Sequence, residues 1–236
     1  MKLRLLLMAP LTVACALADP APMAPDAIVE HYCVAERDQG HVLAGASMEV
    51  DIQASLPKLK KQGRLHALKR ISALGRITYE RLKFEGDGAI KSNVIARYLT
   101  AEAQYQASDE SPLAVTPQNY KFKYKGRNQV DGRPVYVFQV TPRSKRVGLY
   151  KGELSIDAET FLRVQEAGYF VKNPSLFLKR VAFVRKYEIR DGISVPLQIQ
   201  SVVDTRLVGK AELNIEFSNF SLDSQKRADS ADADAQ

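Results

Sequence analysis

The stretch that decides the fold is YKFKYKGRNQVDGRPVYVFQV, residues 120–140. Tyr120, Phe122 and Tyr124 alternate with lysines, so the aromatic side chains lie on one face of an extended strand and the lysines on the other. The Asp131-Gly dipeptide favours a tight turn, and a second apolar run follows it. The stretch therefore predicts a β-hairpin with one apolar face and one solvated face.

The same alternation recurs along most of the chain. After Gly45, for example, Met48, Val50 and Ile52 alternate with acidic and amide residues. Strands are predicted over residues 46–56, 63–71, 76–84, 120–125, 134–140, 147–156, 162–170, 177–189, 194–203 and 207–220. About ten antiparallel strands in an up-and-down series must curl if they are to bury a single apolar face.

Two helices are predicted beside these strands. One spans 26–38, with Asp26 as its cap and Gly40 as its stop, and the other spans 93–104. The segment 86–88, Gly-Asp-Gly, is interpreted as a turn. We expect a mainly β fold, α+β by strict count: a curled antiparallel half-barrel with one or two helices covering its concave face. Such a sheet encloses an apolar cavity if the helices fill it incompletely.

The ends of the chain differ from the middle. Residues 1–18 combine a basic start, an apolar stretch and the small-residue site Ala16-Leu-Ala18, as secretory signal peptides do. We expect cleavage near Ala18 and a periplasmic protein with a linker over 19–25, one domain over 26–222 and a disordered acidic tail over 223–236. In a second interpretation, Val13-Ala-Cys15 resembles a lipobox, and the protein is a lipoprotein anchored to the membrane through Cys15.

The chain carries a formal net charge of +7, with 34 Lys and Arg against 27 Asp and Glu. An exported basic protein meets anionic lipid head groups or acidic proteins, and lysines that solvate a sheet face explain the charge equally well. Nucleic acid is not expected as a partner. The platforms that bind it place aromatic and cationic side chains on a shared face, whereas the alternation from Tyr120 onward separates them.

We find no signature of catalysis, of a metal or of a cofactor. His31, His41 and His66 lack metal-ligand spacing, and no nucleophile elbow is present. Cys33 and His31 lie two positions apart on one predicted helix, where their side chains diverge. We therefore expect no enzyme, no catalytic residue, no bound metal and no cofactor, and we interpret Cys33 as a small buried apolar residue.

Four segments carry a resemblance to a known family: 120–126, 130–137, 142–145 and 150–157, which read YKFKYKG, VDGRPVYV, PRSK and YKGELSID. Their rhythm of strands and hairpins resembles the outer-membrane lipoprotein-sorting (LolA-like) superfamily, which also includes LolB and the N-terminal domain of RseB. The resemblance implies an antiparallel half-barrel with helices plugging its concave face. It also implies a hydrophobic cavity that takes acyl chains of a lipoprotein or a free lipid.

The inner apolar face supplies the candidate ligand-binding residues. They are Met48, Val50, Ile52, Phe84, Phe122, Tyr124, Phe138, Tyr150, Phe183 and Phe217. With them we expect a monomeric carrier or receptor for acyl chains, involved in outer-membrane lipoprotein sorting, whose partner is a lipid or a lipoprotein. The alternative is a sensor or interaction module of the RseB type that binds a partner protein across its outer face or edge strands.

Overall fold

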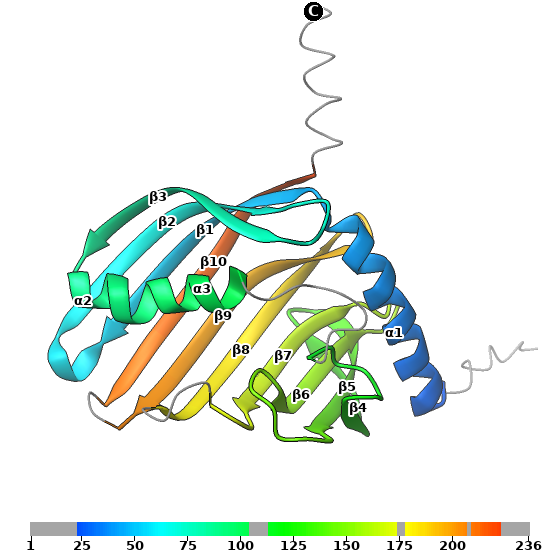
Figure 1. Cartoon of the computed structure of the whole chain (residues 1–236). Helices are drawn as coiled ribbons and strands as arrows, with labels where there is room; N and C mark the ends of the chain where they lie inside the picture. The colour runs from blue at the N-terminus through cyan, green and yellow to red at the C-terminus, as the bar shows by residue number, and fades with distance from the viewer. Residues whose placement is uncertain (1–22, 104–112, 174–177, 207–208, 223–236) are drawn as a thin grey trace, which may run out of the picture.

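The computed structural model describes residues 23–103, 113–173, 178–206 and 209–222, and within them ten strands pair antiparallel in one sheet (Figure 1). The strands are β1 (Ala46–Leu56), β2 (Lys61–Ile71), β3 (Ile77–Gly86), β4 (Tyr120–Val130), β5 (Arg133–Pro142), β6 (Tyr150–Asp157), β7 (Arg163–Phe170), β8 (Leu178–Arg190), β9 (Ile193–Thr205) and β10 (Lys210–Leu222). Each predicted strand corresponds to one of them.

The helical elements are α1 (Pro25–Val42), the single turn η1 (Pro57–Leu59), and the continuous run α2 (Gly88–Ile90), η2 (Lys91–Ile95) and α3 (Ala96–Ala103). The predicted signal peptide and acidic tail lie outside the described residues.

The sheet order is β3-β2-β1-β10-β9-β8-β7-β6-β5-β4. Strands adjacent in sequence are adjacent in the sheet from β1 to β3 and again from β4 to β10. β3 and β4, however, form the two opposite edges, and β1 pairs with β10 so that Ile52 lies opposite Ile215. The expected up-and-down series therefore holds within two runs, and the chain departs from it where it crosses from one edge to the other.

The α2–α3 run begins this crossing on the inner face of the curled sheet (Figure 1). Its first turn is capped by Asp87, whose Oδ1 accepts a hydrogen bond from the backbone N–H of Ala89 at 2.8 Å. The second helix thus begins at Gly88 and not at the predicted Asn93. The segment interpreted as a turn is the end of β3 followed by this cap.

α1 covers the other end of the inner face and is longer than predicted at both ends. It begins at Pro25 with Ala24 as its N-cap, so the predicted cap Asp26 lies inside the first turn, and it continues through Gly40 to Val42. Its last turns are held by a contact with the sheet: the buried Gln39 accepts a hydrogen bond on Oε1 from the backbone N–H of Ser194 at 2.7 Å. Tertiary packing thus overrides the low helix propensity of glycine.

The curl of the sheet has a local cause. The register of several strand pairs shifts at a bulge, for example at Lys125 in β4 and at Leu197 in β9. An extra residue in one strand bends it and increases its twist. The architecture is the expected half-barrel: an open antiparallel sheet with helices on its concave face (Figure 1).

The apolar residues of the inner face form two separate cores. One, the α1 cluster, packs α1 against strands β4 to β8 and is centred on Ile28, Tyr32, Phe138, Tyr150, Leu154 and Phe183. The other, the α3 cluster, packs the α2–α3 run against β1, β2 and β10 and is centred on Val50, Ile52, Ile90, Ile95, Ile215 and Phe217. Each helical element therefore has its own core. No helix in the described part of the chain is both long enough and apolar enough to cross a membrane.

Two glycines meet where β6 and β7 approach most closely. Gly152 lies directly opposite Gly168 in the register. A Cβ atom on Gly152 would lie 1.9 Å from the carbonyl oxygen of Ala167 and 2.6 Å from the Cα of Gly168. Because both are backbone atoms, no side-chain rotation relieves the overlap. The packing of the two strands therefore requires glycine at position 152.

We predict that Gly152→Ala lowers the free energy of unfolding by about 1–3 kcal/mol, the usual cost of an overpacked site. Gly40→Ala is the matched control, because a Cβ at that helical position meets no atom within 4 Å. The control should raise the free energy of unfolding by about 0.5–1 kcal/mol. Urea denaturation measures both variants, and unchanged stability of Gly152→Ala would contradict the close approach.

Candidate functional site

The ten candidate cavity residues fall into two groups of five. Met48, Val50, Ile52, Phe84 and Phe217 belong to the α3 cluster, and Phe122, Tyr124, Phe138, Tyr150 and Phe183 to the α1 cluster. Seven of them are buried, while Phe84, Phe122 and Tyr124 are partly exposed. The sequence placed them on one inner face, and the structure divides that face into two parts. Their role in ligand binding stays a prediction.

A group of charged and phenolic side chains lies between the two clusters, and the sequence analysis did not find it. We call it the polar belt; its members are Glu36, Lys69, Tyr79, Tyr98, Glu102, Arg163, Glu166, Arg185 and Tyr187. Its position follows from the register of β8. Arg185 shares a face with Phe183 of the α1 cluster, and it lies opposite Ile199, which packs on the α3 cluster.

Glu166 of β7 is the most deeply buried member, with a side chain 1% exposed. Its Oε2 accepts hydrogen bonds from Nη1 of Arg185 and from the hydroxyl of Tyr187, both at 3.2 Å. Nη1 of Arg163 lies 3.9 Å from Oε1. Burial acts to raise the pKa of Glu166, but the two guanidinium groups and these hydrogen bonds outweigh it, so the pKa lies below its ordinary value.

A second carboxylate, Glu36, ties α1 to the sheet. Its two oxygens accept hydrogen bonds from Nε and Nη2 of Arg163. The Arg163 guanidinium also lies 5.2 Å from the centre of the Tyr187 ring. Burial raises the pKa of Glu36 even though Arg163 opposes the shift. Two carboxylates of one network thus have their pKa values moved in opposite directions, because Glu166 has more cationic and hydroxyl partners.

The α3 helix is anchored in a similar way at the other end of the belt. Glu102 forms an ion pair with Lys69 of β2 and accepts a hydrogen bond from the Tyr79 hydroxyl of β3. Burial opposes ionisation of Glu102, yet the charge of Lys69 and these hydrogen bonds hold its pKa below the ordinary value. Each helical element is therefore attached to the sheet through a buried carboxylate.

Tyr98 of α3 connects the two halves of the belt. Burial first, and the Glu102 carboxylate next, raise the pKa of Tyr98, while the Arg185 guanidinium acts in the opposite direction. Arg185 thus acts electrostatically on Tyr98 of α3 as well as on Glu166 of β7. Tyr98 lies between the charges around Glu102 and those around Arg185.

Two buried polar atoms beside this network have no hydrogen-bond partner: the hydroxyl of Tyr150 and Nε2 of Gln39. The arrangement can hold a polar or charged group by hydrogen bonds and charge. Among the described residues, no three His, Cys, Asp or Glu side chains are grouped so that they could hold a metal ion.

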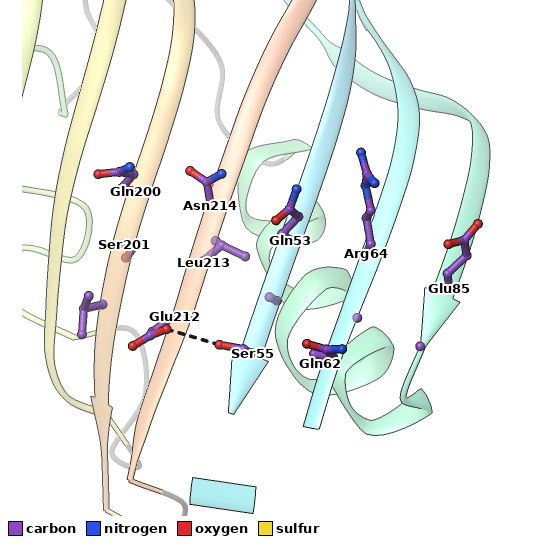
Figure 2. Close-up of a pocket in the computed structure, with 14 residues that line it drawn as sticks. Gln53, Ser55, Gln62, Arg64, Glu85, Gln200, Ser201, Glu212, Leu213 and Asn214 are labelled. Atoms are coloured by element: carbon purple, nitrogen blue, oxygen red, sulfur yellow. Dashed lines mark hydrogen bonds between the residues drawn. The ribbon is translucent and has the colours of Figure 1, made fainter. Parts of the chain in front are cut away.

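The outer face of the sheet carries a groove of about 650 Å³, which runs across β9, β10, β1, β2 and β3 (Figure 2). Figure 2 views the sheet from the side opposite the helices, so the groove is not part of the concave face. Most of the residues that line it are of polar types and include Gln53, Gln62, Arg64, Gln200 and Asn214. Alternation along the strands predicts a solvated outer face and gives no sign of a groove there.

Neither a family model nor a curated protein matches this chain. Solved structures do match it. A LolA superfamily protein from Nitrosomonas europaea has 13% identity and a TM-score of 0.42, over 85% of this chain and 94% of that one. A DUF1329 family protein from Desulfovibrio piger has 15% identity and a TM-score of 0.41, over 83% and 93%. A Vibrio parahaemolyticus domain described as an outer membrane lipoprotein-sorting protein has 13% identity and a TM-score of 0.40, over 81% and 91%.

Similarity at these identities concerns the fold. What the chain binds has to be argued from its own residues.

We predict that Glu166→Gln lowers the free energy of unfolding at neutral pH by about 3–5 kcal/mol, the typical cost of breaking a buried charge pair. The folded-state pKa of Glu166 is depressed, so its contribution is complete above the unfolded value of about 4.5 and is lost as the pH falls through the folded value. The stability difference between wild type and variant should therefore shrink in acid. Denaturation at a series of pH values measures it.

Glu153→Gln is the control for this prediction, because Glu153 of β6 is exposed. The control should remain within about 0.5 kcal/mol of the wild type, as is usual for surface substitutions. A Glu166→Gln variant with the same stability as this control would contradict the role given to the buried carboxylate.

Proposed function

We propose that this chain is an exported binding protein for acyl chains, acting as a lipid or lipoprotein carrier or receptor in outer-membrane lipoprotein sorting. One observation carries the proposal: apolar side chains of both clusters remain partly exposed although helices cover the inner face. They include Phe122, Tyr124 and Phe170 around the α1 cluster and Ile199, Val203 and Phe220 around the α3 cluster. The sheet thus presents more apolar surface than the two helical elements bury.

The energetics suit such a ligand. Removing a methylene group from water stabilises a complex by about 0.8 kcal/mol, so a long acyl chain supplies binding energy without any catalytic group. The helices offer a means of entry, because each is a separate element held on the sheet by its apolar cluster and a few polar contacts, such as Glu36 in α1 and Glu102 in α3. Movement of either helix would uncover apolar surface.

Export is part of the proposal and rests on the sequence of residues 1–18. Cleavage near Ala18 would give a periplasmic protein, and acylation of Cys15 would give a membrane-anchored one. The absence of enzymatic activity and the monomeric state likewise remain predictions.

The second candidate function is an interaction module that binds a partner protein. It is favoured by the groove on the outer face, where the exposed Val202 lies among amide and charged side chains. Such a mixture of polar groups with a small apolar area is usual for surfaces of transient complexes.

Substitutions at two adjacent valines of β9 distinguish the two candidate functions. Val203 faces the α3 cluster, and Val202 lines the outer groove. We predict that Val203→Asn weakens the binding of a fluorescent long-chain fatty acid about tenfold, since it removes methyl groups that the acyl chain would cover and introduces an amide without a hydrogen-bond partner. Val202→Asn should leave that affinity unchanged. Fluorescence titration gives both values, and circular dichroism checks the fold of each variant.

Native mass spectrometry of the protein purified from the periplasm extends this test. Co-purified lipid that is lost in Val203→Asn supports the carrier. The opposite result has two parts: the wild-type protein purifies without lipid, and a periplasmic partner protein retains the wild type but not Val202→Asn. That result contradicts the carrier and supports the interaction module.

A further inference from the structure

We propose that the polar belt binds the anionic head group of an amphiphile, with Arg185 and the Tyr150 hydroxyl as its donors, while the acyl chain lies along one of the two apolar clusters. The inference rests on the proposed function and adds to it the chemical class of the ligand and the site of its polar end.

The sign of the ligand's charge follows from which charges of the belt are exposed. The side chains of Arg163 and Arg185 are 31% and 32% exposed, whereas those of Glu36 and Glu166 are 15% and 1% exposed. The carboxylates are thus covered, whereas the two arginine side chains are about one third accessible. Around Arg163 and Arg185 the belt holds two carboxylates and two arginines, and the more accessible arginine side chains favour an anionic ligand on the inner face.

Donors without partners lie beside these arginines. The Tyr150 side chain is 2% exposed, and its hydroxyl has no hydrogen-bond partner. A buried polar group without a partner is costly and calls for an explanation such as a ligand. Burial raises the pKa of Tyr150 well above its ordinary value, and the charge of Glu166 adds to this shift. The hydroxyl therefore stays protonated and can donate a hydrogen bond to an anion.

A further unpaired donor lies at the α1 end of the belt. Nε2 of Gln39 is buried without a partner, while Oε1 of the same side chain is engaged by Ser194. The hydroxyl of Ser194 in turn donates to the carbonyl oxygen of Arg163. A second unpaired donor is thus linked to the belt through Ser194 and the backbone of Arg163.

The surroundings of Arg185 allow an acyl chain to leave the head group in either direction. Its guanidinium lies 4.4 Å from the centre of the Phe183 ring, and that ring packs edge-on against Tyr150 with centroids 5.2 Å apart. On the other side, Arg185 lies opposite Ile199, a partly exposed residue at the α3 cluster. The polar end of a ligand would thus sit where two apolar surfaces meet.

Both carboxylates and phosphates fit this chemistry, because arginine and phenol donors recognise either oxyanion. The ligand is then a free fatty acid or an acidic phospholipid. A neutral amphiphile of the same chain length would bury the same methylene groups but would leave the belt donors unpaired.

The test compares three amphiphiles of equal chain length: a fatty acid, a lysophosphatidylglycerol and a monoacylglycerol. Isothermal titration with the full mature chain measures each affinity. Wild type should bind one or both anions at least about tenfold more tightly than the neutral compound, the effect of hydrogen bonds to a charged group. Tighter binding of the fatty acid identifies a carboxylate, and tighter binding of the lysophospholipid identifies a phosphate.

Tyr150→Phe is the decisive variant. It should weaken anion binding about tenfold and leave binding of the neutral compound unchanged, while the melting temperature without ligand stays the same or rises because an unpaired buried hydroxyl is removed. A hydroxyl with a purely structural role would show the opposite pattern, with lower stability and no change in selectivity.

Arg185→Gln should abolish the preference for anions. Arg180→Gln is its matched control on the same strand, because Arg180 is exposed and lies at the register position opposite Asp204, on the outer face. Equal affinity of wild type for all three compounds, or an unchanged preference in both Tyr150→Phe and Arg185→Gln, overturns this inference and leaves acyl-chain binding standing. Absence of binding by all three compounds overturns the proposed function as well.

Discussion

The pairing of β1 with β10 is the constraint on which the rest of the structure depends. It joins two runs of strands into one sheet and places β3 and β4 at opposite edges. The chain between those edges has to cross the width of the sheet, and it begins that crossing as the helical run α2–α3 on the inner face. The concave side is therefore covered by two elements of separate origin, α1 and α3, each with its own apolar core.

The polar belt is the physical result of this division. Neither helix reaches the middle of the inner face with apolar side chains, and charged groups occupy that region in place of aliphatic ones. Buried charges are tolerated only when they are paired and hydrogen-bonded, and Glu166 meets that condition through Arg185 and Tyr187. Other members of the belt link the helices to the sheet: Glu36 pairs with Arg163, and Glu102 pairs with Lys69.

The sequence predicts the strands well and the site poorly, for different physical reasons. Alternation along β1 or β10 is a local property, and a strand with one wet and one dry face shows it directly. The Asp131-Gly and Asp191-Gly turns are equally local, because both residues of each pair adopt the positive φ angles that such hairpins need. Strand order depends on contacts between distant segments, for which alternation carries no information.

The belt could have been noticed as an exception to the pattern. In β8 the inward positions run from Val181 and Phe183 to Arg185, so a cation stands where the period requires an apolar residue. Lys69 interrupts the inner face of β2 in the same way after Leu65 and Ala67. What the sequence could not supply is the identity of the partners: the ion pair of Arg163 with Glu36 joins residues 127 positions apart in the chain. A charged residue at an inward-facing position of a strand indicates a site, but only the folded structure shows which residues pair with it.

The position of β10 has a consequence for how such a chain can fold. Ser55 and Glu212, which meet across β1 and β10, are 157 positions apart in the chain. Until the last strand is available, β1 has only β2 beside it, and β9 likewise has only β8. Contacts between such distant segments form slowly, because the entropy of closing a long loop must be overcome first. A chain still emerging from the ribosome would thus hold two partial sheets, each with an open edge that only β10 can close.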